Sequence, residues 1–282
     1  MDADLHMHTT ASDGTDTLSE RVEDAKDKNL SCIAITDHDT INPDLEGRKK
    51  KIKGVRVVTG AEIKAGLDGN KIEVLGYFLD PEGEEINELF QRIKQYRKDR
   101  MKKMVDKIND LIQEEIKLEE VLERAETSVG RPHLARTLKE KGVVESTGEA
   151  FSKYISNEGP AFVPSEKVDA KEVIRIVHEN GGVTSLAHPG RSLTSENAYD
   201  MVEKLVKRGL DGIEVSYTYD LQDRDFSFGV SRADEIAQNL GLIPTGGSDC
   251  HGSKSSKYFL GEVRLPYPYV KKLWEKGEQY RS

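Results

Sequence analysis

The chain contains few cysteines, a single tryptophan and no long apolar run. Its two cysteines, Cys32 and Cys250, form neither a C-x-x-C pair nor a disulfide framework, which predicts a reducing compartment. No apolar run approaches the length of about 20 residues that spans a bilayer. The first residues lack the basic and apolar segments of a signal peptide. We therefore expect a cytoplasmic protein without a membrane partner.

Positive charge is in deficit. The 282 residues include 42 Lys and Arg against 51 Asp and Glu, which gives a formal net charge of −9. Binding to duplex nucleic acid depends on neutralising many phosphates, so this balance argues against duplex nucleic acid as a partner. A small anionic substrate stays compatible with it, because bound cations reverse the local sign of the charge. Nothing in the sequence indicates an obligatory protein partner.

Short apolar segments alternate with helical patterns along much of the chain. Several of these segments are almost continuously apolar, as in parallel strands that are buried on both faces. Amphipathic helices are expected over residues 18–28, 169–180, 195–208 and 231–240. The alternation predicts an α/β barrel or a related open sheet. The seven predicted strands cover residues 3–8, 31–36, 55–63, 71–79, 183–187, 211–216 and 242–245.

One connection departs from this rhythm. The Asp-Gly dipeptide at residues 68–69 is a tight-turn signal that predicts a hairpin between the third and fourth strands. With the turn centred there, Glu62 lies opposite Leu75 and Glu73 lies opposite Lys64. Side-chain alternation then places Glu62 and Glu73 on one face of the hairpin. Glu73 is thereby brought to the same end of the barrel as Glu62.

Residues 82–160 have a different pattern. Their apolar positions follow helical spacing over one long segment and then over shorter ones. One of the shorter helices has Pro132 in its first turn and ends before Gly142. We expect a helical insertion over residues 82–160 that contributes to the substrate pocket. The barrel domain would then comprise residues 1–81 and 161–282.

Side chains of the metal-ligating types recur at or just after the predicted strands. Alternate residues on a strand point the same way, so both histidines of an H-x-H pattern can face one point. A mixture of imidazole and carboxylate suits Mn²⁺, Fe²⁺ or Zn²⁺, and more than one ion. Each residue alone fits a separately satisfied core or cap position, but their common placement favours a metal centre. The predicted cluster comprises His6, His8, Asp13, His38, Glu62, His188, Asp249 and His251.

Other polar residues allow two interpretations. Asp37 is either a further ligand or a group that orients an imidazole, and Glu214 is either part of the site or a buried carboxylate bonded to its neighbours. Arg131 and His133 open a helix, where phosphate binds readily, but their spacing alone favours an ordinary capped turn. The basic run over residues 92–103 fits a solvated helix face better than a surface for a polyanion.

Five short motifs follow one another in a characteristic order. They are His6-X-His8 with Asp13, Thr36-Asp37-His38, Gly60-Ala61-Glu62, Ala187-His188-Pro189-Gly190 and Ser248-Asp249-X-His251. This order resembles the PHP (polymerase and histidinol phosphatase) family of metal-dependent phosphoesterases. The segments 4–14 and 130–136 are also similar to one branch of it, the 3′,5′-nucleoside bisphosphate phosphatases, which are also described as RNase AM. The likeness covers nearly the whole chain.

The resemblance implies a distorted (β/α)₇ barrel and two to three divalent metal ions. Mn²⁺ is the expected ion, ahead of Fe²⁺, Zn²⁺ and Mg²⁺. In one respect the chain departs from the family, because Glu73 stands where a histidine is usual. A carboxylate still ligates, and its hard oxygen favours Mn²⁺ or Mg²⁺. The resemblance implies one ion on His6, His8, Glu62 and Asp249, a second on Asp13, His38 and His251, and a bridge from Glu62 to an ion also held by His188.

The resemblance also assigns roles outside the metal cluster. It turns Arg131 and His133 from cap residues into predicted contacts of a substrate phosphate. Arg191, which follows His188 around the rim, and Lys153 are predicted to bind substrate as well. The predicted catalytic residues are Asp249, His251 and Arg131.

We therefore predict a metal-dependent phosphoesterase that hydrolyses the 3′-phosphate of 3′,5′-nucleoside bisphosphates. Trimming of short RNA from 5′ to 3′ is a related activity of the same predicted site. The expected partner is thus a nucleotide or a short oligoribonucleotide. Two alternatives stay open at this point. One is a phosphatase for another small phosphomonoester, such as histidinol phosphate, and the other is a non-catalytic metal-binding PHP module.

Overall fold

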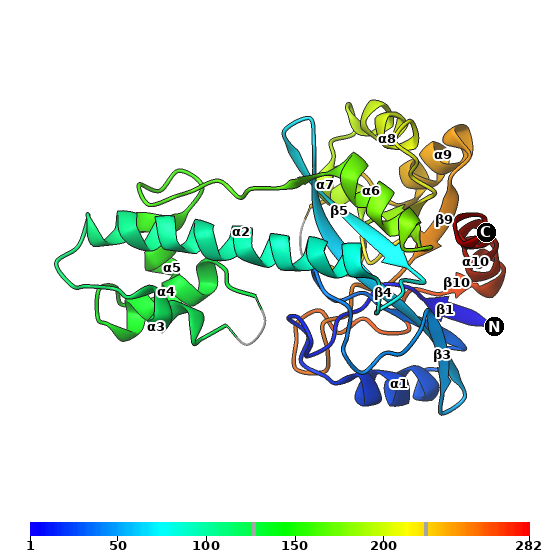
Figure 1. Ribbon diagram of the computed structural model, residues 1–282, viewed down its shortest axis with the longest axis horizontal. Coiled ribbons are helices and arrows are strands. Elements are labelled where there is room, and N and C mark those ends of the chain that lie inside the picture. Colours follow the sequence, from blue (N-terminus) through cyan, green and yellow to red (C-terminus); the bar gives the residue numbers. More distant parts are fainter. Residues whose placement is uncertain (126–127, 223–224) are drawn as a thin grey trace. The chain divides into compact units, whose positions relative to one another are not determined.

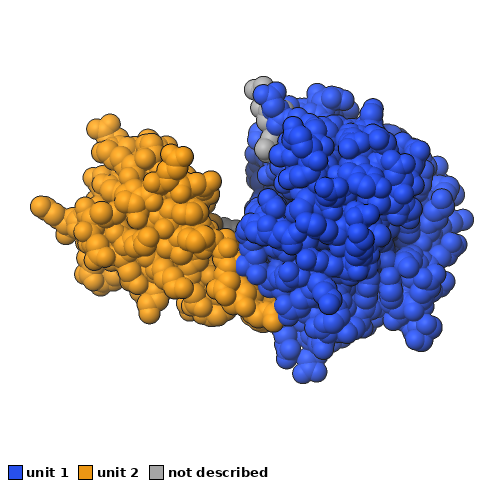
Figure 2. All heavy atoms as spheres, turned by 90° about the horizontal axis from the view of Figure 1, so that it is seen from above, with its two compact units in different colours: residues 1–88, 167–282 blue, residues 89–166 orange. Residues whose placement is uncertain are grey.

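The computed structural model describes residues 1–125, 128–222 and 225–282. The chain forms two compact units, which Figure 2 shows in separate colours. Unit 1 comprises residues 1–88 and 167–282, and unit 2 comprises residues 89–166. These boundaries lie close to those expected for the barrel and its insertion. That the insertion contributes to the substrate pocket stays a prediction.

Unit 1 is built on one mixed sheet (Figure 1). Its strands are β1 (Asp2–Asp4), β2 (Cys32–Ile35), β3 (Lys49–Ile52), β4 (Val55–Leu67), β5 (Asn70–Tyr77), β6 (Val168–Asp169), β7 (Val183–Leu186), β8 (Gly212–Ser216), β9 (Ile243–Gly246) and β10 (Leu265–Pro266). They are ordered β10-β1-β2-β4-β5-β7-β8-β9, and β3 and β6 each pair with β4. The strands β2 and β7 are buried along their whole length, as expected of strands covered on both faces.

Backbone contacts beyond the strand ends nearly close this sheet into a barrel. The N–H of Leu5 donates to the carbonyl of Gly246 over 3.0 Å, and Met7 and Cys250 form a parallel bridge. The predicted distorted α/β barrel is thereby confirmed. All seven predicted strands are present, and their observed ends differ from the predicted ends by at most four residues. The segments that follow β1 and β9 run side by side at the rim.

The hairpin of β4 and β5 is the main departure from a parallel barrel. The strand β5 runs antiparallel to both β4 and β7. Its register pairs Glu62 with Leu75 and Lys64 with Glu73, which confirms the predicted register. The hairpin thus carries two carboxylates on one face, two residues apart across the ladder.

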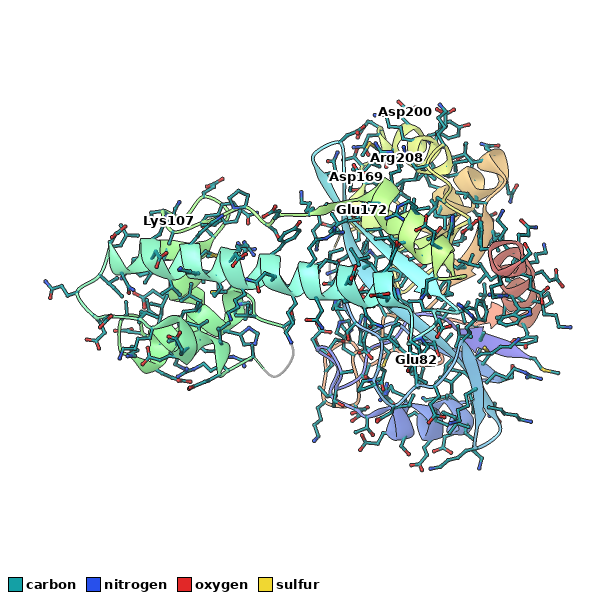
Figure 3. The ribbon with its side chains drawn as sticks, in the orientation of Figure 1. Glu82, Lys107, Asp169, Glu172, Asp200 and Arg208 are labelled. Carbon is teal, nitrogen blue, oxygen red and sulfur yellow. The ribbon has the colours of Figure 1, made fainter. Side chains whose placement is uncertain are left out.

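The helices of unit 1 lie around the outside of the sheet (Figure 1). The helix α1 begins with a capping box of Thr17 and Glu20, and α6 begins at the predicted N-cap, Asp169, which accepts from the N–H of Lys171. Asp169 also lies 3.6 Å from Arg208, and both are labelled in Figure 3. The helices are α1 (Leu18–Asp27), α6 (Ala170–Glu179), α7 (Pro189–Ser192), α8 (Ala198–Val206), α9 (Val230–Leu240) and α10 (Tyr267–Arg281).

Unit 2 is helical and has its own apolar core. The long helix α2 (Glu84–Asn109) begins in unit 1 and continues through unit 2, where Met104 and Ile108 pack with Leu134 and Leu138. The other elements are α3 (Leu118–Leu122), α4 (Arg131–Glu140), α5 (Thr147–Ala150) and the π-helix η1 (Phe151–Ile155). Among the described residues, no helix has the length and apolar character needed to cross a membrane.

Candidate metal centre

Two histidines are carried by the segment that follows β1. The N–H of His8 donates to the carbonyl of Cys250 over 2.9 Å, and the N–H of Asp249 donates to the carbonyl of His6 over 2.8 Å. Gly247 lies directly against this segment, because a Cβ on it would be 2.2 Å from the Cβ of His6. A larger residue at this position would push the two segments apart. The nearly closed sheet therefore brings predicted ligands from both ends of the chain together.

Glu62 is the centre of the cluster. Its side chain is buried in the middle of β4, and four imidazoles surround it. Its Oε1 lies 2.8 Å from His188 Nε2 and 3.5 Å from His6 Nε2. Its Oε2 lies 2.8 Å from His38 Nδ1 and 3.5 Å from His8 Nε2. A carboxylate in this position can contact more than one bound cation.

The two carboxylate oxygens of Asp249 face different groups: one faces the imidazoles of the cluster, and the other faces a hydroxyl and two cationic side chains. Its Oδ1 lies 3.1 Å from His8 Nε2. Its Oδ2 accepts from the hydroxyl of Tyr217 over 2.8 Å, and it lies 3.2 Å from Lys257 and 3.5 Å from Arg191. Neither Tyr217 nor Lys257 was predicted, because an isolated tyrosine or lysine in a loop carries no sequence signal. The predicted role of Arg191 in substrate binding stays a prediction.

The exposed edge of the cluster is formed by Asp13. Its side chain is 57% exposed, and its carboxylate lies 3.8 Å from His8, 3.7 Å from His38 and 3.6 Å from His251. One carboxylate facing three imidazoles is the arrangement expected around a bound cation. The exposure of Asp13 also marks the side from which solvent reaches the cluster.

Glu73 reaches the cluster from β5, as the hairpin predicted. Its side chain is buried, and Oε2 lies 3.5 Å from His188 Nε2. Lys71, two residues earlier on the same strand, lies 3.0 Å from Oε1. Burial and the neighbouring Glu62 raise the pKa of Glu73, but its electrostatic interactions with His188, Lys71 and His38 outweigh them and bring it to about 2. Glu73 is therefore placed as an ionised carboxylate, and its role as a ligand stays a prediction.

The cluster has the donor geometry of a site for more than one divalent ion. Buried atoms that include His6 Nε2 and His8 Nδ1 have no hydrogen-bond partner among the described residues. Unpartnered buried donors and acceptors are costly unless a ligand such as a cation satisfies them. In each of four groups the ligand atoms lie within 4.8 Å of one another: His8, Asp13, His38 and His251; His6, Glu62 and His188; His6, His8 and Asp249; and His38, Glu62 and Glu73.

Each residue predicted as a ligand belongs to at least one of these groups. Two of them, His188 and Asp249, also have positive φ angles, +26° and +53°. Residues other than glycine rarely adopt this conformation, and it is found disproportionately at functional sites. The structure thus brings the predicted ligands together on a backbone that is held in an unfavourable conformation at two of them.

The pKa values of His8 and of the Glu62 carboxyl are shifted toward the forms that bind cations. Burial, followed by repulsion from His251 and His38, lowers the pKa of His8 to about 4. Burial raises the pKa of the Glu62 carboxyl, but His38 and His6 more than offset this effect, so its pKa lies well below the usual range. Neutral imidazole and ionised carboxylate are the forms that ligate metals. Burial lowers the pKa values of His6 and His38, but nearby carboxylates, Glu214 and Glu62 for His6 and Glu62 for His38, more than offset this effect and raise both.

Glu214 and Asp37 support the cluster from behind. Glu214 is fully buried, accepts from the N–H of His188 over 2.7 Å, and lies 3.1 Å from His6 Nδ1. A carboxylate behind a ligating imidazole fixes its tautomer and orientation. Asp37 does not contact an imidazole in this way, because it accepts from Thr9 and from Ser12 over 2.6–2.7 Å. Its contacts hold the loop that carries Asp13.

The predicted phosphate contacts of the insertion lie in unit 2. Arg131 donates to the carbonyl of Ile155 and to the side chain of Asn157, and His133 Nδ1 accepts from the N–H of Gly130 over 3.0 Å. The bond between His133 and Gly130 caps the first turn of α4, as the spacing of these residues in the sequence predicts. Lys153 is exposed and pairs with Glu149 over 2.6 Å. The role of these residues in substrate binding stays a prediction.

Comparisons with known proteins agree with this geometry. The model of the PHP domain matches residues 4–224. A 5′-3′ exoribonuclease of Haemophilus influenzae is 31% identical over 76% of this chain and 78% of its own length. A phosphoribosyl 1,2-cyclic phosphate 1,2-diphosphodiesterase of Eggerthella lenta is 31% identical over 88% of this chain and 94% of its own length.

Two further likenesses extend over almost the whole chain. A 3′,5′-nucleoside bisphosphate phosphatase of Chromobacterium violaceum is 24% identical over 98% of this chain and 96% of its own length. A solved structure from Bifidobacterium adolescentis, described as a metal-dependent phosphoesterase, has a TM-score of 0.74 and 29% identity over 98% of this chain and 96% of its own. The likeness thus includes unit 2 as well as the barrel.

Proposed function

The chain belongs to the PHP domain family of metal-dependent phosphoesterases, and on that premise we propose that it hydrolyses the 3′-phosphate of 3′,5′-nucleoside bisphosphates. The named relatives, an exoribonuclease, a diphosphodiesterase and a phosphatase, support an enzyme over the non-catalytic PHP module. The observation that carries the proposal is the convergence of eight ligand-type residues around Glu62, in a chain that resembles a bisphosphate phosphatase along nearly its whole length.

Divalent ions fit this cluster, and we propose Mn²⁺ because the donors mix imidazole nitrogen with several carboxylates. When bound, such ions lower the pKa of water and offset negative charge on a phosphoryl group. Asp249 would serve with one oxygen toward the ions, while Tyr217 and Lys257 hold its other oxygen. His251, which is buried beside the exposed Asp13, would act next to the reacting phosphate.

Positive charge at the rim would select anionic substrates. Arg191 and Lys257 both approach Asp249 and lie 30% and 28% exposed, so each can also reach a ligand. In unit 2, the described partners of Arg131 are neutral: a carbonyl, an amide and the rings of Phe151 and Phe162. Its guanidinium charge is thus available for a phosphate. We propose that Arg131 and His133 hold the 5′-phosphate, which would favour bisphosphates over monophosphates.

Two related substrates test the limits of this proposal. The likeness to a 5′-3′ exoribonuclease supports action on the 5′ end of short RNA. The likeness to the 1,2-cyclic phosphate diphosphodiesterase covers 94% of that enzyme, which favours a cyclic phosphoribosyl ester as the second candidate substrate. All three reactions cleave a phosphoester in a nucleotide-like molecule, so the same ion cluster could serve each.

The first experiment is a substrate panel with the Mn²⁺-reconstituted protein. It contains 3′,5′-adenosine bisphosphate, 5′-AMP, histidinol phosphate, a 5′-phosphorylated short oligoribonucleotide and phosphoribosyl 1,2-cyclic phosphate, with all products resolved. We expect the highest kcat/KM for the bisphosphate, with 5′-AMP left intact. A higher kcat/KM for the cyclic ester would replace the proposed substrate by the second candidate. Turnover of histidinol phosphate alone would remove the nucleotide assignment.

The role of Arg131 is tested with Arg131→Ala. Loss of a charge-assisted hydrogen bond to phosphate is expected to lower kcat/KM for the bisphosphate about 10- to 100-fold. Bound metal, measured by elemental analysis, should stay at the wild-type level. Lys139→Ala, an exposed cation on the same helix α4, is the matched control and should leave kcat/KM unchanged. An unaltered kcat/KM in Arg131→Ala would exclude Arg131 from phosphate binding.

A further inference from the structure

A cavity lies in unit 1, between α10 and the first residues of β2 and β4. Its volume is about 250 Å³. Cys32 and Arg56 line it and pair with each other at the beginning of β2 and β4. His38 and Glu62 follow six residues later in the chain, which corresponds to roughly 20 Å along an extended strand. The cavity is therefore separate from the metal centre.

The inner surface of this cavity is apolar and aromatic. Val58, Phe78 and Val270 line it and are at most 4% exposed. Tyr267 and Trp274, both on α10, complete the wall. Apolar and aromatic walls with a few polar groups are typical of small-molecule sites. This lining suits a planar or apolar ligand body.

The rim carries an excess of positive charge. Lys49, Arg56 and Lys271 line the cavity together with one carboxylate, Glu275. Lys49 Nζ lies 3.1 Å from the centroid of the Trp274 ring. Among the residues that the structure describes, none of the three cations has a carboxylate within ion-pair distance. They lie instead over aromatic rings. Arg56 and Lys271 both lie over the ring of Tyr267, at 5.0 Å and 6.0 Å from its centroid.

The charge of Lys49 is only partly compensated. Burial lowers its pKa, and the neighbouring Arg281 lowers it further, against a smaller opposite effect of Glu278. An anion beside Lys49 would favour its charged form. A guanidinium, as in Arg56, also binds phosphate or carboxylate oxygens in a fixed planar geometry.

We propose that this cavity binds a small aromatic anion of the mononucleotide class. Its ring would pack against Tyr267 and Val270, and its acidic group would contact Lys49, Arg56 and Lys271. This inference is independent of the proposed phosphoesterase substrate, because none of these residues belongs to the metal cluster. The ring and the anionic group are both required, since the apolar wall and the cationic rim each bind one part of the ligand.

The single tryptophan of the chain reports on this cavity directly, because Trp274 lines it. Tryptophan emission and calorimetry are followed while 5′-AMP, adenosine or inorganic phosphate is added to the full-length protein. The same titrations use Asp249→Asn, which alters the metal centre, and Lys49→Gln and Lys271→Gln, which remove one exposed rim cation each. Lys50→Gln is the matched control, because Lys50 is the next residue on β3 and its side chain points to the opposite face.

We expect saturable binding of 5′-AMP in the wild type and in Asp249→Asn, and weaker binding of adenosine and of phosphate. The dissociation constant should rise about tenfold in Lys49→Gln and in Lys271→Gln and stay unchanged in Lys50→Gln. Circular dichroism checks that each variant is folded. The proposal is overturned if the wild type shows no saturation at millimolar 5′-AMP. Loss of binding in Asp249→Asn, or equal weakening in Lys50→Gln, would overturn it as well.

Discussion

Glu214 contacts two predicted ligands at once. One of its oxygens faces His6 Nδ1 at 3.1 Å, and the other accepts from the backbone N–H of His188 at 2.7 Å. His188 has a φ angle of +26°, so this second bond also stabilises an unfavourable backbone conformation. A neutral amide in place of the carboxylate offers only one acceptor oxygen. One of the two donors would then lose its partner.

We expect Glu214→Gln to weaken Mn²⁺ binding about 10- to 100-fold, because the group that orients a ligating imidazole commonly contributes this much to metal affinity. The measurement is competition with a metal-ion chelator, read as bound Mn²⁺ per chain. Glu203→Gln is the control, because Glu203 is a half-exposed carboxylate on α8 that pairs only with Lys207, just after this helix, among the described contacts. Equal Mn²⁺ affinity in wild type and Glu214→Gln would show that the carboxylate does not orient His6.

At the scale of elements, Asp211 joins three parts of unit 1. It lies just before β8 and accepts from the N–H of Thr184 on β7 over 2.9 Å. His178 Nε2 on α6 lies 2.8 Å from it, and the hydroxyl of Tyr280 on α10 donates over 2.6 Å. The side chain is buried. The C-terminal helix is thus attached to the barrel through a carboxylate that is hydrogen-bonded on several sides.

Asp211→Asn is expected to lower the free energy of unfolding by about 2–3 kcal/mol, because buried donors lose a charged acceptor. Burial raises the pKa of Asp211, but its bond to His178 and others more than offset this effect, so the pKa lies below 3.8. The stabilisation from its ionised form is therefore present above about pH 4 and is lost as the pH falls through the lower native pKa. Urea unfolding at several pH values measures this.

The control for that measurement is Tyr269→Phe. Tyr269 lies on α10, the helix that also carries Tyr280, and its ring contacts Lys272. The stability of this variant should equal that of the wild type at each pH. If the stability difference between wild type and Asp211→Asn did not shrink at all as the pH was lowered from neutral to the acid limit of the native state, the ionised carboxylate would not be its source.

The sequence predicted those elements whose residues show a strong local pattern. The hairpin register followed from one turn, and Asp169 and Pro132 correctly placed the starts of α6 and α4. The strands β3, β6 and β10 were missed, because β3 begins with three lysines and the other two have only two residues each. Their pairing depends on neighbours far away in the chain, and local periodicity does not record that.

The candidate site shows the same limit. The predicted ligands converge because each follows or lies on a strand, and the strand pattern was readable. Lys257 and Tyr217, which contact Asp249, lie in loops, and only the folded chain brings them there. Asp37 sits beside a ligand in a motif, yet its oxygens face Thr9 and Ser12. Its place next to His38 in the sequence predicted that Asp37 lies near the cluster, but it did not predict which groups its oxygens bond to.

At the scale of the whole molecule, the two units have separate apolar cores, and all predicted metal ligands lie in unit 1. Ions that bind the native state stabilise it by RT ln(1 + [L]/Kd), which is about 4 kcal/mol at 1,000 times Kd. Without ions, several buried atoms of the cluster have no partner among the described residues. Metal binding should therefore stabilise unit 1 far more than unit 2.

We expect Mn²⁺ to slow amide hydrogen exchange in peptides of residues 1–88 and 167–282, with the largest effect on β4, β5 and the segments after β1 and β9. Peptides of residues 89–166 should exchange at nearly the same rate with and without Mn²⁺. Ca²⁺ at the same concentration is the control, because it prefers oxygen ligands and an imidazole-rich cluster should bind it weakly. Exchange measured by mass spectrometry separates the units peptide by peptide. Equal slowing in both units would mean that metal binding stabilises the molecule as one cooperative body, and no slowing in unit 1 would exclude the cluster as a Mn²⁺ site.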